Sequence, residues 1–454
     1  MEHRADRWAA GDGATAVASA GHGKPTPLKR SLPRTDKDWV TTRLREHGSA
    51  LVVAAAGVWA MTYLALYGFG WNDYGDEVAP AYSALTSGHV WQFLKLAPTY
   101  GGSLELRAPF AFIPGLWNGG QDAVYQAVSI PCLIAAALLA IWLIARMRAL
   151  GYGRLARTTT LALCVVNPVT LYALQLGHPE ELLGGVLCVA AVLLAQRDHA
   201  SWSGLLLGLA IVNKQWALLA IGPVLVALPA HRWRAMAIAG AITVLFYIPL
   251  ALPALLAHSA GSTTPALAAS GGGSIFQPWQ LWWFLGSHGH LVRDSFGVVK
   301  VGYRTPPAWI ESIAHPLIVA LALPVTLLAA RRGRRDAMLL LAFLLALRFA
   351  LDTWDTVYYP LPFLLALLAW ESLRWRRPPV LALAASVVAW LVFIVAPEHL
   401  SADAQSAVFL LAAVPTLMAL AVALYAPSTW PRRVISQLSP QRSSAPVTGP
   451  ISTV

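Results

Sequence analysis

Charged residues are scarce in this sequence, and that scarcity excludes an ordinary soluble fold. Only 12% of the 454 residues are Asp, Glu, Lys or Arg, whereas 57% are hydrophobic, and the mean hydropathy is +0.56. A soluble core of this size cannot hide so much apolar surface. The composition therefore predicts a polytopic membrane protein whose solvent is the bilayer.

Cysteine is also rare, and several familiar motifs are missing. The 3 cysteines all fall inside apolar segments, which excludes a disulfide framework and a cysteine metal site. The sequence contains no glycine-rich phosphate loop of the nucleotide-binding types, which argues against an ATP-driven pump within this chain. No apolar run precedes Leu51, so we expect no cleavable secretory signal.

The basic residues are grouped in a way that reports membrane topology. The net charge of +11 is compatible with nucleic acid binding, but the arginines form no continuous basic face. They lie in short clusters between apolar segments, for example at 146–157 and 331–335. The positive-inside rule places these clusters, and both termini, in the cytoplasm. The opposite gaps hold most of the acidic residues, so we expect a multi-pass cell-membrane protein with its chemistry on the extracytoplasmic side and no nucleic acid partner.

Apolar segments long enough to cross a bilayer as helices recur along the chain, with shorter ones between them. The longer segments lie at residues 49–68, 123–145, 156–174, 181–196, 236–256, 309–330, 378–396 and 404–426. The shorter segments lie at residues 202–213, 215–229, 337–351 and 357–371. We predict an all-α transmembrane fold with about 11 to 13 spans, in which the short segments pair with neighbours or stop beside a water-filled cavity.

The chain divides into a membrane domain and two tails. Residues 1–48 and 431–454 read as disordered cytoplasmic tails, and residues 49–430 as the transmembrane domain. Two outer segments, 71–122 and 257–306, are too long for simple turns, and we expect them to build the site with helices along the membrane interface. The second contains Trp282 in an aromatic group that either anchors at the interface or stacks on a sugar.

The first outer segment opens with three carboxylates, Asp73, Asp76 and Glu77. Three acids within five residues repel one another unless a cation or a proton lies between them. A hydrated acidic loop is the alternative interpretation. The three acids are therefore candidates for chemistry at the outer face.

Further polar groups interrupt the apolar segments on or near the same side. His178 stands beside Glu180 and Glu181, which suggests proton handling or the binding of a phosphate or metal, although the glutamates also suit the first turn of a helix. Lys214 interrupts a long apolar run. Two half-length helices meeting there would place its ammonium at the floor of an outward cavity, where it could pair with a lipid phosphate, whereas a snorkelling lysine is the alternative.

A third polar group lies at the end of the segment 337–351. Arg348 precedes Asp352 by four residues, a spacing that favours an ion pair within one helix, and Tyr358 and Tyr359 follow. Structural pairing is the favoured role for Asp352. The Arg348 guanidinium can also hold two phosphate oxygens.

These pieces together resemble the GT-C superfamily of membrane glycosyltransferases that use polyprenol-phosphate sugars, and most closely its actinobacterial branch that uses polyprenyl-phosphate-mannose. The resemblance covers roughly residues 50–425 and depends on the order of the pieces and their common outer side. The matching stretches are Gly75-Asp76-Glu77, Tyr82, Ser87-Gly88-His89, Leu106-Arg107-Ala108-Pro109, Gly177-His178-Pro179-Glu180, Gly204 to Gly208 with Lys214, and Asp352 to Tyr359 with Trp354.

The resemblance implies a function and a site. A hexose, with mannose first, would move from a polyprenyl-phosphate donor to a hydroxyl of a lipid or glycan acceptor, with inversion. It places the general base on Asp76, with Glu77 and Asp73 as substitutes, because the attacking hydroxyl needs a carboxylate. Cations must hold the departing phosphate. The candidates for that role are Lys214, His178, Arg107 and Arg348, and those for substrate binding are Glu180, Asp352, Tyr358, Tyr359 and Trp282.

Two questions stay open at this stage. The motifs imply no cofactor, but some members of the superfamily bind a divalent cation at the acidic pair, which Asp73, Asp76 and Glu77 could also do. A transporter or flippase for a lipid-linked sugar is the alternative function, since it could use the same broken helices and cations without chemistry. The strong acids at the outer edge, rather than deep in a span, favour the transferase.

Overall fold

The computed structural model describes residues 36–67, 72–98, 100–256, 276–288, 292–293, 299–331 and 336–426. Residues 1–35, 431–454 and the glycine run 271–273 lie outside the described residues. The chain forms two units, Met1–Glu46 and His47–Val454. Helix α1 (Asp36–Leu64) begins in the first unit and continues into the second, so residues 36–48, predicted as tail, are helical where they are described.

The second unit is an all-α polytopic membrane fold, as predicted. Among the described residues, five helices are long and apolar enough to cross a membrane: Gln121–Ala149, Arg232–Pro253, Ala308–Ala330, Val380–His399 and Ala402–Tyr425. Four shorter apolar helices lie at Gly48–Leu64, Ala200–Asn213, Gln215–Ala227 and Ala337–Leu351. The strands of the described part are two antiparallel pieces of two residues, β1 (Val292–Arg293) and β2 (Val299–Lys300).

The first outer segment is helical throughout most of its length. It contains a π-helical turn η1 (Tyr74–Val78), α2 (Ala79–Thr86), α3 (Val90–Leu96), α4 (Gly101–Ala111) and the 3-10 turn η2 (Ile113–Trp117). The described residues of this segment therefore contain three short α-helices. The long helix α5 (Gln121–Ala149) follows directly.

Helix α8 (Pro179–Ala195) occupies the centre of the second unit. It packs against α5, α7 (Pro168–Gln175), α9 (Ala200–Asn213), α10 (Ile221–Ala227), α14 (Ala337–Leu351) and α15 (Leu361–Arg374). Helix α6 (Arg154–Val165) connects α5 to α7 and touches α15. Because α8 is surrounded, nearly all its side chains are buried, and both glutamates of its first turn are 0% exposed.

Small residues allow close helix pairing between α9 and α11 (Arg232–Leu256). A Cβ atom on Gly204 would lie 2.3 Å from the carbonyl oxygen of Ala235. Only glycine, which has no Cβ atom, allows the two backbones to approach this closely. Small residues commonly bring membrane helices together in this way.

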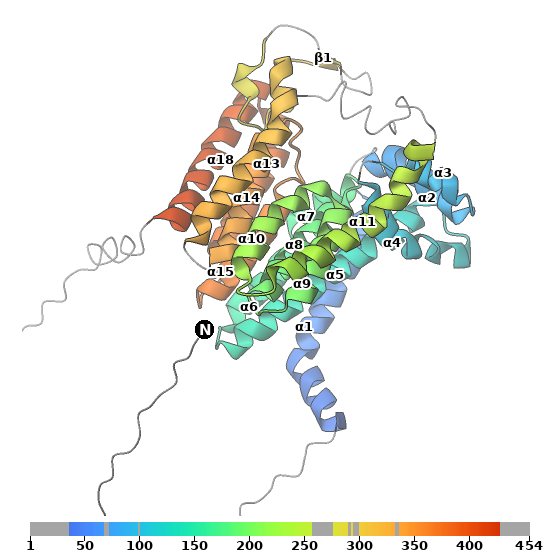
Figure 1. Cartoon of the computed structure of the whole chain (residues 1–454), viewed down its shortest axis with the longest axis vertical. Coiled ribbons are helices and arrows are strands. Elements are labelled where there is room, and N and C mark those ends of the chain that lie inside the picture. The colour runs from blue at the N-terminus through green and yellow to red at the C-terminus, as the bar shows by residue number, and fades with distance from the viewer. Residues whose placement is uncertain are drawn as a thin grey trace, which may run out of the picture. The chain divides into compact units, whose positions relative to one another are not determined.

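The remaining helices form the C-terminal part of the fold. They are α13 (Ala308–Ala330), α14, α15, α16 (Val380–Trp390), the π-helical turn η6 (Leu391–Val395), α17 (Ala396–His399) and α18 (Ala402–Tyr425). Figure 1 shows α13, α14 and α18 side by side, in agreement with their packing contacts.

The described part of the second outer segment is tied to this group of helices. Trp283, in the short turn η4 (Trp283–Leu285), donates from Nε1 to Oδ1 of Asp403 at 2.7 Å. Arg304 donates to the same carboxylate at 2.8 Å. Trp282 donates from its indole to the Leu351 carbonyl oxygen at 2.7 Å. The segment is therefore held against the ends of α14 and α18.

Candidate functional site

A buried network of charged side chains lies where the first outer segment meets the start of α8 and the ends of α9 and α14. His178 connects the first outer segment to α8 in this network. Its Nε2 atom lies 2.6 Å from Oδ2 of Asp73, and its Nδ1 atom lies 2.7 Å from Oε1 of Glu180. Two acids on one imidazole stabilise its charged form. Burial by itself lowers the pKa of His178, but the charge of Glu180 and the hydrogen bond to Asp73 outweigh it and raise the pKa to about 9.

Local sequence explains why His178 stands at this place. It is the residue directly before α8, and Pro179 is the first residue of that helix. Proline is favourable at this position because the first backbone N–H groups of a helix have no partner within the helix. Gly177 has φ +94°, and a Cβ atom there would meet the backbone nitrogen of Tyr74 at 2.5 Å. The Asp73 backbone N–H also donates to the Leu176 carbonyl oxygen at 3.0 Å. The two chain segments therefore meet backbone to backbone, which brings Asp73 to His178.

Lys214 connects the two glutamates of α8. The helix α9 ends at Asn213, Lys214 itself is extended, and a 3-10 turn η3 (Gln215–Ala220) follows. The predicted break at Lys214 is thus present. Its Nζ atom lies 3.0 Å from Oε1 of Glu181 and 3.4 Å from Oε1 of Glu180, and the side chain is 13% exposed. The ammonium is therefore paired with both carboxylates of the first turn of α8.

Asn213 holds this break in position. Its Nδ2 atom donates to the Glu180 carbonyl oxygen at 2.7 Å, and its Oδ1 atom accepts from the Ser103 hydroxyl at 3.1 Å. One buried amide therefore joins α4, α8 and the end of α9. Neither Asn213 nor Ser103 was singled out from the sequence, although Asn213 precedes the lysine that interrupts the apolar run.

Arg348 extends the network to α14. Its two terminal nitrogens each lie 3.3 Å from an oxygen of Glu181, which is the paired geometry that a guanidinium favours. The rings of Tyr359 and Trp216 lie 4.3 Å and 4.8 Å from its central carbon. The pair with Asp352 that the spacing suggested is replaced by this one, and Asp352 lies 3.4 Å from Nε2 of His315.

Arg107 supports the network from inside. It is 1% exposed, lies 3.5 Å from Oε2 of Glu180 and donates to the Ser103 carbonyl oxygen at 3.2 Å. Its contacts are therefore with the protein, and it positions Glu180.

The aromatic candidates line the same network. The Tyr358 ring lies 4.2 Å from the His178 ring and 5.8 Å from the Lys214 ammonium. Tyr100, which sequence reasoning missed, lies on the other side of Lys214 at 4.8 Å and donates a hydrogen bond to Glu77. Trp282 is anchored to the end of α14 as described above.

Asp73 and Asp76 are placed differently. Asp73 is bound to His178, with its side chain 20% exposed. Asp76, one turn later in η1, is exposed. In the described part of the chain no three ligating side chains converge on a point that would hold a metal ion.

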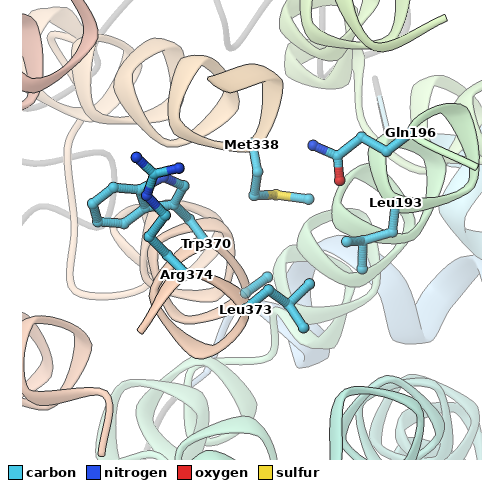
Figure 2. A pocket seen from close by; sticks show the side chains of 7 residues that line it. Leu193, Gln196, Met338, Trp370, Leu373 and Arg374 are labelled. Atoms are coloured by element: carbon cyan, nitrogen blue, oxygen red, sulfur yellow. The ribbon is translucent and has the colours of Figure 1, made fainter. Parts of the chain in front are cut away.

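A separate cavity lies at the far ends of three helices that carry the site. It has a volume of about 430 Å³ and is lined by residues of α8, α14 and α15: Leu193, Gln196, Met338, Ala369, Trp370, Leu373 and Arg374. Figure 2 shows Gln196 facing Met338, with Arg374 beside Trp370. None of the candidate site residues lines this cavity.

The fold and the network define a polytopic membrane protein whose polar site is built from helix ends at one side of the bundle. The model of glycosyltransferase family 87 matches residues 102–353. This match covers more than half of the chain, so the protein belongs to glycosyltransferase family 87. No curated protein sequence matches it.

Membership of this family confirms the predicted class of protein. The chain is a membrane glycosyltransferase of the GT-C type, with a sugar donor and an acceptor as substrates. The matched range includes Arg107, His178, Glu181, Lys214 and Arg348, whereas Asp73, Asp76 and Glu77 precede it.

Proposed function

We propose that this glycosyltransferase moves a hexose, with mannose as the first candidate, from a polyprenyl-phosphate donor to an acceptor hydroxyl at the outer membrane face. The observation that carries this proposal is the network in which Lys214 and Arg348 share the carboxylate of Glu181. A sugar phosphate attached to a lipid chain needs cations at the membrane surface for its phosphate and apolar surroundings for its chain. Lys214 supplies an ammonium that is 13% exposed at the edge of a helical membrane bundle.

The proposed reaction is a single displacement. The acceptor oxygen attacks the anomeric carbon, the bond from that carbon to the phosphate oxygen breaks, and the electron pair leaves with the polyprenyl phosphate. Attack opposite to the leaving group inverts the anomeric centre. Lys214 and Arg348 stabilise the charge that develops on the phosphate, and preorganised cations of this kind act most strongly away from bulk water.

A carboxylate of the first outer segment takes the proton of the acceptor hydroxyl. The sequence favoured Asp76, whereas the contacts favour Asp73, because the Asp73 carboxylate is bound to His178 within the network. Oδ2 of Asp73 is bound to His178, and Oδ1 is the atom proposed to accept the proton. His178, charged at neutral pH, fixes the orientation of this carboxylate.

The two tails and the orientation of the termini complete the proposal. Residues 1–48 and 431–454 are proposed to lie in the cytoplasm, and the network on the opposite side, because the arginine clusters favour that topology.

The test is transfer of labelled sugar by the full chain in lipid nanodiscs. Polyprenyl-phosphate mannose, glucose and galactose are offered with membrane acceptors to the wild type and to Asp73→Asn, Asp76→Asn and, as a control, Glu398→Gln. Glu398 is an exposed acid of α17. Transfer by wild type and Glu398→Gln, with loss in Asp73→Asn while donor binding persists, supports the proposal.

Two other results would change the assigned base or refute the proposed donor. Loss confined to Asp76→Asn would move the base to Asp76. Absence of transfer from every polyprenyl-phosphate donor, together with transfer from another sugar donor, would refute the proposed donor class.

A further inference from the structure

Buried polar atoms without partners are concentrated on two adjoining segments, residues 279–282 and 350–355, beside the charged network. Nine buried side-chain nitrogen and oxygen atoms of the described residues have no hydrogen-bond partner. Four of them belong to Trp279, Gln280 and Asp355: the indole Nε1, the amide Oε1 and both carboxylate oxygens. An unpaired buried polar atom costs about 1 to 3 kcal/mol, so such a concentration calls for a binding partner.

The three residues lie on two segments that are bound together. Gln280 donates from Nε2 to the Thr353 carbonyl oxygen at 3.0 Å, and the Leu281 N–H donates to the Ala350 carbonyl oxygen at 2.9 Å. Together with the Trp282 bond to Leu351, these contacts place residues 279–282 along residues 350–355. Gln280 and Asp355 are both 0% exposed, so their unpaired atoms are not simply turned to solvent.

The chemistry of these atoms selects the kind of ligand. Burial and the neighbouring charge of Asp352 raise the pKa of Asp355 well above its ordinary value, so its neutral acid both donates and accepts. The Trp279 indole donates and the Gln280 carbonyl accepts. A sugar hydroxyl also donates and accepts, so several hydroxyls satisfy this set. A phosphate does not, because it cannot donate to the Gln280 carbonyl.

The position of these three residues beside the charged network indicates that they face the sugar of the donor rather than that of the acceptor. The Asp355 carboxyl is close enough to Arg348 and Glu181 for their charges to act on it. Tyr359, four residues further along the chain, lies on the Arg348 guanidinium at 4.3 Å. In a polyprenyl-phosphate sugar the hexose is bonded directly to the phosphate, so hydroxyl-binding groups next to a phosphate-binding arginine face the donor sugar.

We propose that Asp355, Gln280 and Trp279 bind hydroxyl groups of the donor hexose and thereby determine which sugar this protein accepts. This inference rests on the proposed function, because it assumes that Arg348 holds the donor phosphate. The Trp279 ring packs at 5.3 Å from Phe393, which fixes the direction of its N–H.

The test measures the affinity of the full chain in nanodiscs for three donors that differ only in hydroxyl configuration: polyprenyl-phosphate mannose, glucose and galactose. The variants are Asp355→Leu, which removes both carboxyl oxygens at a similar volume, and Trp279→Phe, which keeps an aromatic ring against Phe393 but removes the indole N–H with its five-membered ring. Thr170→Val is the matched control, because the Thr170 hydroxyl is also buried and unpaired but lies on α7. Binding of polyprenyl phosphate without a sugar is measured for each.

We expect the wild type and Thr170→Val to discriminate among the three donors. In Asp355→Leu and Trp279→Phe the ratio of dissociation constants between the preferred donor and the others should fall by about 10- to 100-fold, the usual effect of losing one such hydrogen bond. Binding of the lipid without a sugar should change less than twofold.

An unchanged ratio in both variants would overturn the inference, and so would an equal loss of the lipid without a sugar. Equal affinity of the wild type for all three donors would overturn it as well. These binding results do not depend on turnover. A wild type that discriminates among the donors but transfers none would therefore refute the proposed reaction and leave the sugar-binding role standing.

Discussion

The ammonium of Lys214, the residue that follows α9, lies 3.0 Å from Oε1 of Glu181 in the first turn of α8. Glu181 also receives both terminal nitrogens of Arg348, so one carboxylate of α8 holds a cation from the end of α9 and another from the end of α14. Removing one partner of a buried pair leaves an uncompensated charge and costs about 3 to 5 kcal/mol. This relationship connects the stability of the bundle to the placement of the cations that the proposed reaction uses.

A double-mutant cycle separates the two roles of Lys214. We expect Lys214→Met and Glu181→Gln each to lower the unfolding temperature in nanodiscs, and the double variant to lose less than the sum, with a coupling of about 0.5 to 3 kcal/mol. Glycosyl transfer should stay lost in the double variant, because no ammonium is present. Recovery of transfer together with stability would show that Lys214 acts only as a partner for Glu181.

Arginine and lysine should not be interchangeable at position 348. The guanidinium meets both oxygens of Glu181, and an ammonium cannot reproduce that paired geometry. We expect Arg348→Lys to lower kcat/KM for transfer by roughly tenfold or more, the equivalent of about one charged hydrogen bond. Arg374→Lys, an exposed arginine at the far end of α15, is the matched control and should behave as wild type. Equal losses in both variants would contradict the assignment.

The stability of the protein should depend on the charge of His178. Its pKa is about 9 in the folded protein and 6.5 ordinarily. Because the folded value is the higher one, the contribution of His178 is fully present below pH 6.5 and is lost as the pH rises through 9. Unfolding temperatures measured in nanodiscs should therefore decline across this window, and the decline should be smaller in His178→Gln. The same slope in wild type and variant would mean that other groups cause it.

Gly177 should tolerate no side chain. Its φ of +94° and the 2.5 Å approach of a Cβ atom to the Tyr74 nitrogen are separate obstacles. Gly88 provides the control, because its φ is +83° and a Cβ atom there meets nothing within 4 Å. Gly88→Ala should cost about 1 to 2 kcal/mol of stability from the backbone alone.

Gly177→Ala should cost clearly more, and it should also reduce transfer, since it separates Asp73 from His178. Circular dichroism thermal scans and turnover would be compared for both variants. Equal losses of stability would show that the Tyr74 backbone yields without cost.

Much of the fold could be predicted because the bilayer imposes simple rules on sequence. Apolar segments must be helices when water is absent, so their positions follow from hydropathy. The break at Lys214 was predictable for the same reason, since a buried ammonium interrupts an apolar run. The number of spans stays a prediction.

The partners within the site could not be predicted from spacing. Arg348 and Asp352 are four residues apart, but Asp352 ends the helix in an extended conformation, with φ −70° and ψ 136°. Its side chain therefore leaves the helical face on which an ion pair would form. The partner of Arg348 is instead 167 residues away in sequence, and only the packing of α14 against α8 brings them together.

Those sequence separations also constrain how the protein is made. Glu181 enters the membrane with α8, Lys214 follows 33 residues later, and Arg348 follows 167 residues after Glu181. Until α14 emerges from the ribosome, the carboxylate of Glu181 has only part of its final complement of positive charge. An unpaired charge is costly in hydrocarbon, so we expect the first turn of α8 to stay near water or the insertion machinery until α14 is inserted. Insertion of α14 then supplies Arg348 and completes the charge balance at Glu181.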